Sequence, residues 1–400
     1  MRVLLLTQHY APEVTAGRFR VEAFAEALAR RGHEVDVICP VPNHPGGVVE
    51  EDFRGRFLVR RRVGGVRVAY LWVATSPHKT QRTRLAYYAS YAGLATAAGM
   101  LRRRPDLLIA SSPPLSVAAA GTLVSMRHRV PALLDIRDLW PYTPISVGEL
   151  APGRVTDALE RMERWVYGKA GAVVTANDAF ARYIADRAPA GKRIVAIANG
   201  TTQAWLDAGA RPVERAAVGL PRDRFVWAYA GNIGLAHGVD HAVEAQRLLG
   251  DDYRLLLIGE GPRRADVVRE AETLSGQVDV RSLMPPAEAG RHLRAADAVL
   301  VSERQELVVS AKLYDACAIG RPIVAACTGE LRRLIETEGL GLVVPHGDPR
   351  ALAEAIREVR ANPERGERLV ASARAFARRH LREVQAERFA ALGESMVGPG

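Results

Sequence analysis

The sequence predicts an α/β protein made of two doubly wound domains, each with a mostly parallel sheet. Short apolar runs alternate with amphipathic helical segments, and this alternation starts again after Asn199-Gly200-Thr201. The length of 400 residues fits two domains. Because ligands of such sheets bind where the strands end, the residues that follow each strand are the first candidates for a functional site.

The first half of the chain begins with an apolar run at 2–7, followed at 18–31 by a segment whose apolar residues recur at helical spacing. Gly32 ends this helix, and Gly64 and Gly65 separate two runs that we expect to pair as a hairpin. Strands are predicted in this half at 2–7, 34–39, 58–62, 66–72, 106–110, 131–136, 172–175 and 194–197. In the second half, strands are predicted at 225–230, 253–258, 278–283, 298–301, 322–326 and 341–344.

Residues 1–205 are predicted to form the first domain and residues 206–380 the second. The segment 208–222 contains two glycines and two prolines and is the predicted linker. A last helix is predicted over about 363–392, so that 381–400 forms a C-terminal helix returning toward the first domain. We expect ligands to bind in a cleft between the two domains.

The segment 85–101 contains no charged residue and is flanked by arginines on both sides. A membrane-spanning helix needs about 20 apolar residues. This segment has 17 residues and includes three tyrosines, so we interpret it as a helix packed within its domain. A helix lying on a membrane surface is the alternative, and a spanning helix is the less favoured one.

The composition limits the class of protein. Apolar residues make up 48% of the chain and charged residues 25%, as in soluble globular proteins. The net charge is +10, but almost all basic residues are arginine, which indicates a composition bias of the genome rather than a nucleic-acid partner. A phosphorylated small molecule or a lipid headgroup is the expected anionic partner. Three cysteines without metal-ligand spacing, and no signal peptide pattern, predict the cytoplasm.

Three predicted strands run into turns that contain glycine. Gly17 lies in the loop after the first strand, Gly231 and Gly234 follow the strand at 225–230, and Gly259 follows the strand at 253–258. Glycine before a helix lets free backbone N–H groups meet a phosphate, although glycine in such a loop often serves the turn alone. The spacing is not that of the dinucleotide fingerprint. Together the three turns indicate an anion site.

Two charged motifs also follow predicted strands. DIRDLWP at 135–141 places two carboxylates and a guanidinium at the end of a strand, either as a site or as an ion pair that ties down the loop. Lys312 and Asp315 lie three positions apart, on one face of a short helix between two strands. From spacing alone, this pair is either an ion pair along the helix or a set of ligand-binding groups.

These motifs together resemble the retaining glycosyltransferases of family 4, which have the GT-B fold of two Rossmann-like domains. The chain is most similar to the branch that includes L-fucosamine transferases of bacterial surface-polysaccharide synthesis, and the resemblance covers nearly its whole length. It rests on YAPE at 10–13, RRGHEV at 30–35, SPP at 112–114, DIRDLWP at 135–141, NG at 199–200, YAGNIG at 229–234, IGEGP at 258–262 and the stretch 302–327.

The resemblance implies transfer of a sugar, an N-acetylhexosamine or a related hexose, from a nucleotide-diphosphate donor with retention of configuration. It implies a uridine diphosphate (UDP) donor, and neither a metal ion nor a further cofactor. The implied catalytic residues are Arg137, Asp138 and Lys312. The implied donor-binding residues are Gly17, Gly231, Asn232, Gly234, Gly259, Met284, Ser310, Ala311, Lys312, Leu313 and Asp315. The implied acceptor-binding residues are Tyr10, Arg20 and Trp140.

Within this resemblance, Lys312 matches the lysine of a Pro-Ser-Lys motif that grips the diphosphate, and Asp315 matches a glutamate that holds the ribose. Three positions depart from the family pattern. The motif reads Ser310-Ala311-Lys312, the second glutamate is the shorter Asp315, and Leu307 stands where the family keeps its first glutamate. The departures leave the grip on the donor sugar open.

The acceptor is expected to bind the first domain, at loops after Thr7, at 44–47 and at 72–84. A lipid-linked glycan, a secondary metabolite and a peptide remain alternatives for it, and the arginine clusters permit contact with the inner face of a membrane. Two other functions stay open: a sugar epimerase or phosphorylase on the same scaffold, and a nucleotide-sugar-binding protein without activity.

Overall fold

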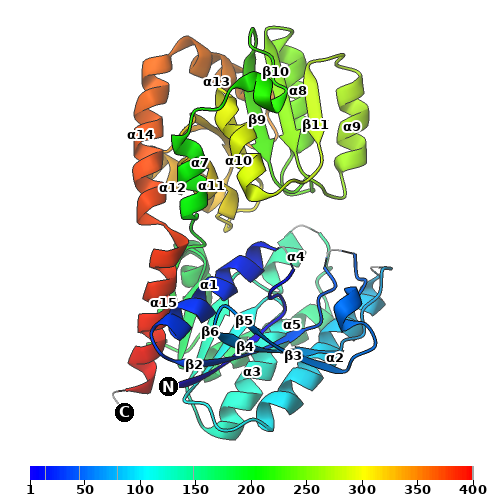
Figure 1. The fold of residues 1–400 in the computed structure, drawn as a ribbon, viewed down its shortest axis with the longest axis vertical. Coiled ribbons are helices and arrows are strands. Elements are labelled where there is room, and N and C mark those ends of the chain that lie inside the picture. Colours follow the sequence, from blue (N-terminus) through cyan, green and yellow to red (C-terminus); the bar gives the residue numbers. More distant parts are fainter. Residues whose placement is uncertain (14, 45, 79, 147, 399–400) are drawn as a thin grey trace. The chain divides into compact units, whose positions relative to one another are not determined.

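The computed structural model describes residues 1–13, 15–44, 46–78, 80–146 and 148–398. The chain divides into two compact units. Unit 1 consists of Met1–Ala198 together with Arg382–Gly400, and unit 2 consists of Asn199–Leu381 (Figure 1). Each unit is an α/β layer structure with a mostly parallel sheet, so the predicted fold class is confirmed.

Unit 1 is built on an eight-stranded sheet in the order β3-β4-β2-β1-β5-β6-β7-β8. Its strands are β1 (Arg2–Thr7), β2 (Glu34–Pro40), β3 (Leu58–Val63), β4 (Val66–Leu71), β5 (Leu107–Ser112), β6 (Ala132–Ile136), β7 (Ala172–Thr175) and β8 (Ile194–Ala196). All neighbours pair in parallel except β3, which forms the predicted hairpin with β4. Strand order reverses direction between β1 and β5, which is a topological switch point.

Helices cover both faces of this sheet. Its helices are α1 (Ala16–Arg30), α2 (Gln81–Met100), α3 (Leu115–His128), α4 (Tyr142–Ser146), α5 (Arg154–Lys169), α6 (Asp178–Ala185) and α15 (Arg382–Val397), with a 3-10 turn η1 (Glu51–Phe53). Helices α1 and α15 pack together on one face, and α2 and α3 pack together on the other (Figure 1). The side chain of Thr15 caps α1 by accepting a hydrogen bond from the amide of Arg18.

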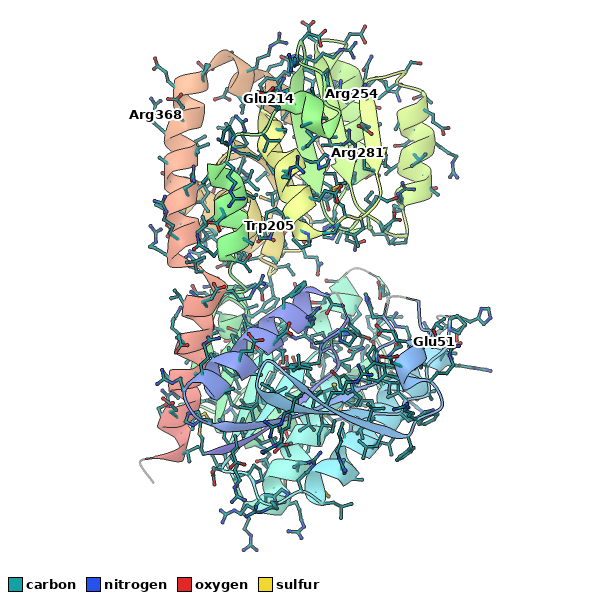
Figure 2. All side chains as sticks on the ribbon, in the orientation of Figure 1. Glu51, Trp205, Glu214, Arg254, Arg281 and Arg368 are labelled. Atoms are coloured by element: carbon teal, nitrogen blue, oxygen red, sulfur yellow. The ribbon has the colours of Figure 1, made fainter. Side chains whose placement is uncertain are left out.

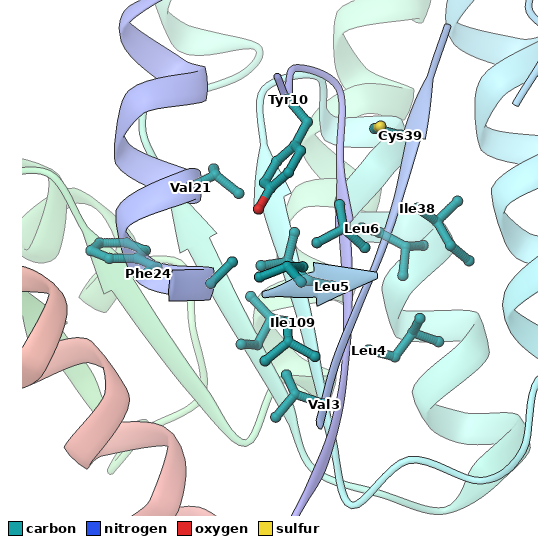
Figure 3. Packing of buried hydrophobic residues seen from close by; sticks show 14 of the residues in the cluster. Val3, Leu4, Leu5, Leu6, Tyr10, Val21, Phe24, Ile38, Cys39 and Ile109 are labelled. Atoms are coloured by element: carbon teal, nitrogen blue, oxygen red, sulfur yellow. The ribbon is translucent and has the colours of Figure 1, made fainter. Parts of the chain in front are cut away.

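The core of unit 1 surrounds β1, whose residues Val3 to Leu6 are all nearly fully buried. A parallel strand that is covered on both faces needs such a continuous apolar run. The ring of Tyr10 lies inside the same cluster, near Val21 and Leu5 (Figure 3). Phe24 of α1 stacks on Phe389 of α15 at a centroid distance of 3.9 Å, which adds the last helix of the chain to this core.

Unit 2 is built on a six-stranded parallel sheet in the order β11-β10-β9-β12-β13-β14. Its strands are β9 (Phe225–Ala230), β10 (Tyr253–Ile258), β11 (Val278–Arg281), β12 (Ala298–Glu303), β13 (Ile323–Cys327) and β14 (Leu342–Val344). Its helices are α7 (Gln203–Ala210), α8 (Val239–Leu249), α9 (Arg264–Glu272), α10 (Pro286–Ala295), α11 (Ala311–Ile319), α12 (Gly329–Glu338), α13 (Pro349–Ala361) and α14 (Pro363–Arg379), with a 3-10 turn η2 (Arg215–Val218). The switch point lies between β9 and β12.

The structure corrects the predicted linker at 208–222. The division between the units falls at Ala198 and Asn199, earlier than the predicted boundary at 205. The segment 208–222 lies inside unit 2, and its first residues belong to α7, which packs closely on α11: a Cβ on Gly209 would come 2.2 Å from the carbonyl oxygen of Ala318 in α11. Trp205 of α7 also lies against Gly290 of α10 (Figure 2).

The predicted helix over 363–392 is two helices. Helix α14 ends at Arg379 and α15 begins at Arg382. The intervening Leu381 forms an isolated parallel bridge with Thr201, and the amide of Thr201 donates to the carbonyl of His380. The chain leaves unit 2 at this point, so that α15 belongs to unit 1 and α14 to unit 2.

The uncharged segment 85–101 lies almost entirely within α2, which packs against α3. Tyr91, Ala95 and Gly99 of α2 are buried, and the hydroxyl of Tyr91 donates to the carbonyl oxygens of Thr7 and Ile38. Over the described ranges, no helix is both long enough and apolar enough to cross a membrane.

Candidate active site

The candidate active site of unit 2 forms at the switch point between β9 and β12. At such a point, neighbouring strands send their connections to opposite faces of the sheet and leave a crevice at their carboxyl ends. Gly231 follows β9, Glu303 is the last residue of β12, and α11 begins at Ala311 on the same edge. Strand topology therefore brings two of the three predicted glycine turns, those after β9 and β10, together with Lys312.

Two of the glycines are required for close packing. A Cβ on Gly231 would lie 2.6 Å from Cδ of Lys312, and a Cβ on Gly259 would lie 1.9 Å from the carbonyl oxygen of Gly231. Non-bonded carbon and oxygen atoms do not approach this closely, so neither position accepts a larger residue without displacement. The glycine turns after β9 and β10 thus stack backbone on backbone beneath the lysine.

Lys312 points from the first turn of α11 into a small polar cluster. Its Nζ lies 3.4 Å from Nδ1 of His237 and 5.7 Å from the ring centroid of Tyr229. Burial lowers the pKa of Lys312 to about 8, although the carboxylate of Glu303 opposes this shift. Burial and the nearby lysine lower the pKa of His237 to about 3. His237 is therefore neutral near pH 7, while Lys312 is mostly charged.

Glu303 also belongs to this cluster, although it was not among the site residues predicted from the sequence. Its carboxylate is only 2% exposed, and its Oε2 lies 3.6 Å from Nδ1 of His237. Burial raises the pKa of Glu303, while Lys312 and hydrogen bonds from the amides of Gln305 and Arg304 act against that shift. The available signal was an acidic residue two positions after the apolar run 298–301, and β12 continues two residues further than predicted, to Glu303.

The N-terminus of α11 carries an unsatisfied hydroxyl. Ser310 is the N-cap residue of α11, yet its side chain makes no cap hydrogen bond, and its buried Oγ has no hydrogen-bond partner within the described parts of the chain. The first amides of a helix and a free hydroxyl together form a natural site for a phosphate oxygen. Ala311, the first residue of α11, adds its backbone N–H to this end of the helix.

Leu313 and Asp315 occupy different surroundings from Lys312. The side chain of Leu313 is fully buried in the core, and its amide donates to the carbonyl of Ser310, so the structure gives it no group facing a ligand. Asp315 accepts a hydrogen bond of 2.8 Å from the hydroxyl of Thr201. The two charged residues on this helix face thus contact different partners, which favours separate roles over an ion pair along the helix.

The remaining predicted donor residues of unit 2 lie in loops at the same edge. The carbonyl of Asn232 accepts from the hydroxyl of Tyr229 at 2.7 Å, and its side chain packs against Gly234 and Gly261. Met284 is half-buried in the loop between β11 and α10.

In unit 1, a buried polar network lies at the switch point between β1 and β5. Arg20 of α1 donates two hydrogen bonds to Oδ1 of Asp135, and Ser111 donates to Oδ2 of the same carboxylate. Arg137 in turn donates from Nε to the hydroxyl of Ser111 at 2.9 Å. Its guanidinium packs on Gly17, where a Cβ would lie 1.8 Å from Nη1. The network fixes Arg137 against the start of α1.

Burial corrects two predicted acceptor contacts. Tyr10 and Arg20 are each 2% exposed. The ring of Tyr10 packs in the core. Nη1 of Arg20 donates to the carbonyls of Ile197 and Ala198. Neither side chain faces solvent: Arg20 ties α1 to the residues after β8, and Tyr10 fills the core of unit 1.

Asp138 and Trp140 follow β6 in the loop that leads to α4. Oδ1 of Asp138 accepts hydrogen bonds from the amide of Leu139 and the hydroxyl of Thr143, and burial raises the pKa of the carboxyl. These bonds tie the loop down, as expected for the structural alternative. Trp140 is half-buried and meets the ring of Tyr88 edge-on at 6.1 Å.

A cavity of about 440 Å³ opens at the carboxyl edge of the unit 1 sheet. Its walls come from the three regions expected to bind an acceptor: the loop after β1, the loop after β2, and the segment from β4 into α2. Its lining residues include Gln8, His9, Asn43, His44, Arg84 and Tyr88.

A carboxylate beneath this cavity joins two of its loops. Oε2 of Glu13 lies 2.6 Å from Nδ1 of His9, and Oε1 accepts from the amides of Asn43 and His44. Burial raises the pKa of Glu13, but the hydrogen bonds from His9 and the two amides outweigh it and leave the pKa below its usual value. Glu13 is the last residue of the YAPE motif, and His9 directly precedes that motif. No role was predicted for either residue from the sequence.

Comparison with known proteins gives the class of this fold and site. Residues 16–200 match the family described as glycosyl transferase 4-like domain, and residues 224–362 match glycosyl transferases group 1. D-inositol 3-phosphate glycosyltransferase of Kineococcus radiotolerans is 30% identical over 91% of this chain and 88% of its own length. The same enzyme of Xylanimonas cellulosilytica is 33% identical, over 65% of each chain.

Solved structures agree on the fold. Sucrose-phosphate synthase from Thermosynechococcus elongatus superimposes with a TM-score of 0.74 at 18% identity, covering 98% of both chains. Anabaena HepE in complex with UDP and glucose gives a TM-score of 0.71 at 15% identity, again covering 98% of both chains. The fold and site thus define a glycosyltransferase of the GT-B type. The chain belongs to the glycosyltransferase family 4 group, with a 4-like domain and a group 1 domain.

Proposed function

We propose that this glycosyltransferase moves an N-acetylhexosamine or related hexose from a UDP-sugar to an acceptor, with retention of configuration and without a metal ion or further cofactor. The observation that carries the proposal is the arrangement around α11. A lysine, a free serine hydroxyl and the first amides of a helix lie together beside two glycine turns. These groups suit a diphosphate, since each offers a donor and the lysine adds charge.

The names of structural neighbours support a UDP-linked donor. HepE was crystallised with UDP and with UDP-glucose, and another neighbour is described as a UDP-forming trehalose-phosphate synthase from Burkholderia xenovorans. In this chain, Asp315 and Met284 are the candidates for the ribose and the base. Asp315 already accepts a hydroxyl hydrogen bond from Thr201, which a ribose hydroxyl would replace or share.

In the proposed mechanism, the leaving diphosphate receives the acceptor's proton on the same face of the sugar where the new bond forms. The C1–oxygen bond to the diphosphate breaks, the acceptor oxygen bonds to C1, and configuration is retained. Lys312, Ser310 and the amide of Ala311 would stabilise the negative charge that develops on the diphosphate. Arg137 and Asp138 are proposed to act near the sugar from unit 1, where Ser111 and Thr143 hold them in place.

We assign the acceptor to the 440 Å³ cavity of unit 1. Its lining includes two tyrosine rings, two histidines and Arg84, so it offers both flat apolar surface and hydrogen bonds to a polar ring. This composition favours a glycan or a sugar-like acceptor over an apolar one. Trp140 would extend the surface through its contact with Tyr88.

The decisive experiment measures transfer and hydrolysis with a panel of nucleotide sugars, for the wild type and for Lys312→Ala. We expect turnover with a UDP-sugar and a loss of about 100-fold or more in kcat for the variant, as is usual when a donor to a developing charge is removed. Lys169→Ala, an exposed lysine in unit 1, is the matched control and should retain full activity.

Product analysis separates the alternatives. An epimerase would convert the donor without any acceptor, whereas a transferase needs one or hydrolyses the donor slowly. Tight donor binding without turnover over a wide acceptor panel would point to a binding protein. Failure of all nucleotide sugars to bind would overturn the proposal.

A further inference from the structure

A second cavity of unit 1, of about 550 Å³, lies away from the candidate active site and is lined by seven arginines but only two carboxylates. It opens at the amino ends of β1, β2 and β4, between the β3–β4 hairpin and the segment that follows α2. Its apolar floor is made by β1 and β4. The cavity is therefore strongly basic and is formed by several elements rather than by one flexible loop.

Three of the seven arginines are neutralised by neighbouring carboxylates. Arg67 bonds to Asp36 at 2.7 Å, Arg102 lies 3.8 Å from the same carboxylate, and Arg61 pairs with Asp52 at 3.0 Å.

The other four arginines are Arg2, Arg60, Arg62 and Arg103. Within the described residues, none of their guanidinium groups makes a hydrogen bond or an ion pair, and all four line the same cavity. Like charges gathered around one cavity repel each other, and this repulsion is relieved when an anion binds. The positive charges of these four arginines are therefore gathered around the cavity and are not neutralised by other side chains in the described parts of the protein.

The basic cavity is distinct from the acceptor cavity. The basic cavity includes Arg2 at the start of β1, whereas the acceptor cavity includes Gln8 just past its end. Strand β1 spans six residues, and at a rise of about 3.3 Å per residue its first and last Cα atoms lie about 17 Å apart. The amino ends of the parallel strands lie at one edge of the sheet and their carboxyl ends at the opposite edge. The two cavities therefore lie at opposite edges, and one small ligand does not reach both.

We propose that this cavity is an accessory site for a phosphate-bearing ligand, with the unpartnered arginines as its binding groups. A guanidinium offers parallel N–H donors that match two oxygens of a phosphate, and the fixed fork loses less entropy than a lysine would. The volume exceeds that of a single small ion and suits a diphosphate or a phosphorylated headgroup. The inference does not depend on the proposed donor or acceptor.

The phosphate group of such a ligand could belong to a soluble phosphorylated compound or to the headgroup of an anionic lipid. Two probes distinguish these two sources. Inorganic pyrophosphate is titrated by calorimetry into the Lys312→Ala protein, so that the donor site contributes little. Vesicles of phosphatidylglycerol, with phosphatidylcholine vesicles as reference, are used in a sedimentation assay. Both are run at about 0.1 M salt, where charges more than about 10 Å apart are largely screened.

Two triple variants carry the test. In Arg60→Gln/Arg62→Gln/Arg103→Gln, three unpartnered arginines of the cavity lose their charge. In Arg154→Gln/Arg161→Gln/Arg164→Gln, three exposed arginines of α5 lose theirs, with the same change in net charge and no residue in the cavity. We expect the cavity variant to lower affinity about tenfold or more, and the α5 variant to change it less than twofold.

The outcomes decide between the sources and against the proposal. Loss of pyrophosphate binding only in the cavity variant indicates a soluble ligand, and loss of vesicle binding only in that variant indicates a lipid headgroup. Equal losses in both variants, or a wild type that binds neither probe, overturn the proposal. Hydrogen exchange of the Lys312→Ala protein adds a readout that does not need the triple variants. Pyrophosphate or vesicles should protect β3 and the residues after α2, and protection elsewhere alone would also overturn it.

Discussion

Lys312 has a positive charge that its own surroundings make dependent on pH. Burial lowers its pKa to about 8, and His237, with a pKa of about 3, does not titrate in the same range. Because a diphosphate binds the protonated lysine more tightly, UDP affinity should change little between about pH 6.5, above which the terminal phosphate of UDP is mostly ionised, and about pH 7. Above about pH 8 it should fall by up to about tenfold per unit until the pKa of the bound state is reached. Calorimetry with UDP across this range measures the midpoint. An affinity that stays constant up to about pH 10 would contradict it.

Glu303 sets the position of that midpoint. Its carboxylate favours the charged form of Lys312 and so keeps the lysine pKa from falling further. Glu303→Gln removes this effect, and the midpoint of UDP binding should move to lower pH. Glu306→Gln removes the same charge from an exposed position three residues away and should leave the midpoint in place. Identical shifts in both variants would show that only net charge matters.

Two glycines of α2 allow a prediction at the scale of one element. Gly93 is exposed, and a Cβ built there would have no atom within 4 Å. Gly93→Ala should raise the free energy of unfolding by about 0.5–1 kcal/mol, because alanine loses less backbone entropy in a helix. A Cβ on Gly99 would lie 2.8 Å from Cγ2 of Val124 in α3, so Gly99→Ala should lower it by about 1–3 kcal/mol.

Denaturant unfolding of both variants and of the wild type measures these changes. The two substitutions are chemically identical and lie on the same helix, so helix propensity affects them equally. A destabilised Gly93→Ala would mean that this face of α2 is covered in the folded protein. Such a result would direct attention to a partner on α2.

Most strands were predictable because buried parallel strands require continuous apolar runs, and such runs are visible in a single sequence. The strands at 2–7, 172–175, 225–230 and 253–258 have the predicted bounds. The break between α14 and α15 was not predictable, because it depends on the bridge between Leu381 and Thr201, which are distant in sequence. That the first residues of the predicted linker are helical likewise depends on packing of α7 against α10 and α11.

The candidate site was predictable only where the local pattern carries the geometry. Lys312 and the glycine turns after β9 and β10 follow strands whose carboxyl ends share an edge, and the topology brings them together. Arg20 was misjudged because its partner, Asp135, lies far along the chain and no spacing rule connects them. Tyr10 was misjudged because a tyrosine after a strand fits a binding loop as well as a core. Long-range burial, unlike periodicity, is a property of the fold.

At the scale of the whole molecule, the course of the chain links its last helix to its first unit. Phe389 of α15 is fully buried against Phe24, while Phe376 of α14 is 1% exposed and stacks near Tyr314 in unit 2. The C-terminal part of α15 is also tied to unit 1 through Glu394, whose carboxylate oxygens lie 2.6 Å from Nη2 of Arg31 and 2.7 Å from Nε2 of His33. Adjacent helices therefore stabilise different units.

We predict that equivalent substitutions on these two helices loosen different halves of the protein. Phe389→Ala and Phe376→Ala should each cost about 3–5 kcal/mol, the usual loss for a buried phenylalanine. Hydrogen exchange should accelerate in β1, β2 and β5 for Phe389→Ala, although this residue lies after unit 2 in sequence. For Phe376→Ala it should accelerate in β12, β13 and α11. Each variant is the control for the other, because the residue lost is the same. Equal acceleration across both units in either variant would mean that the units unfold as one, and the separate cores would then not be the units of stability.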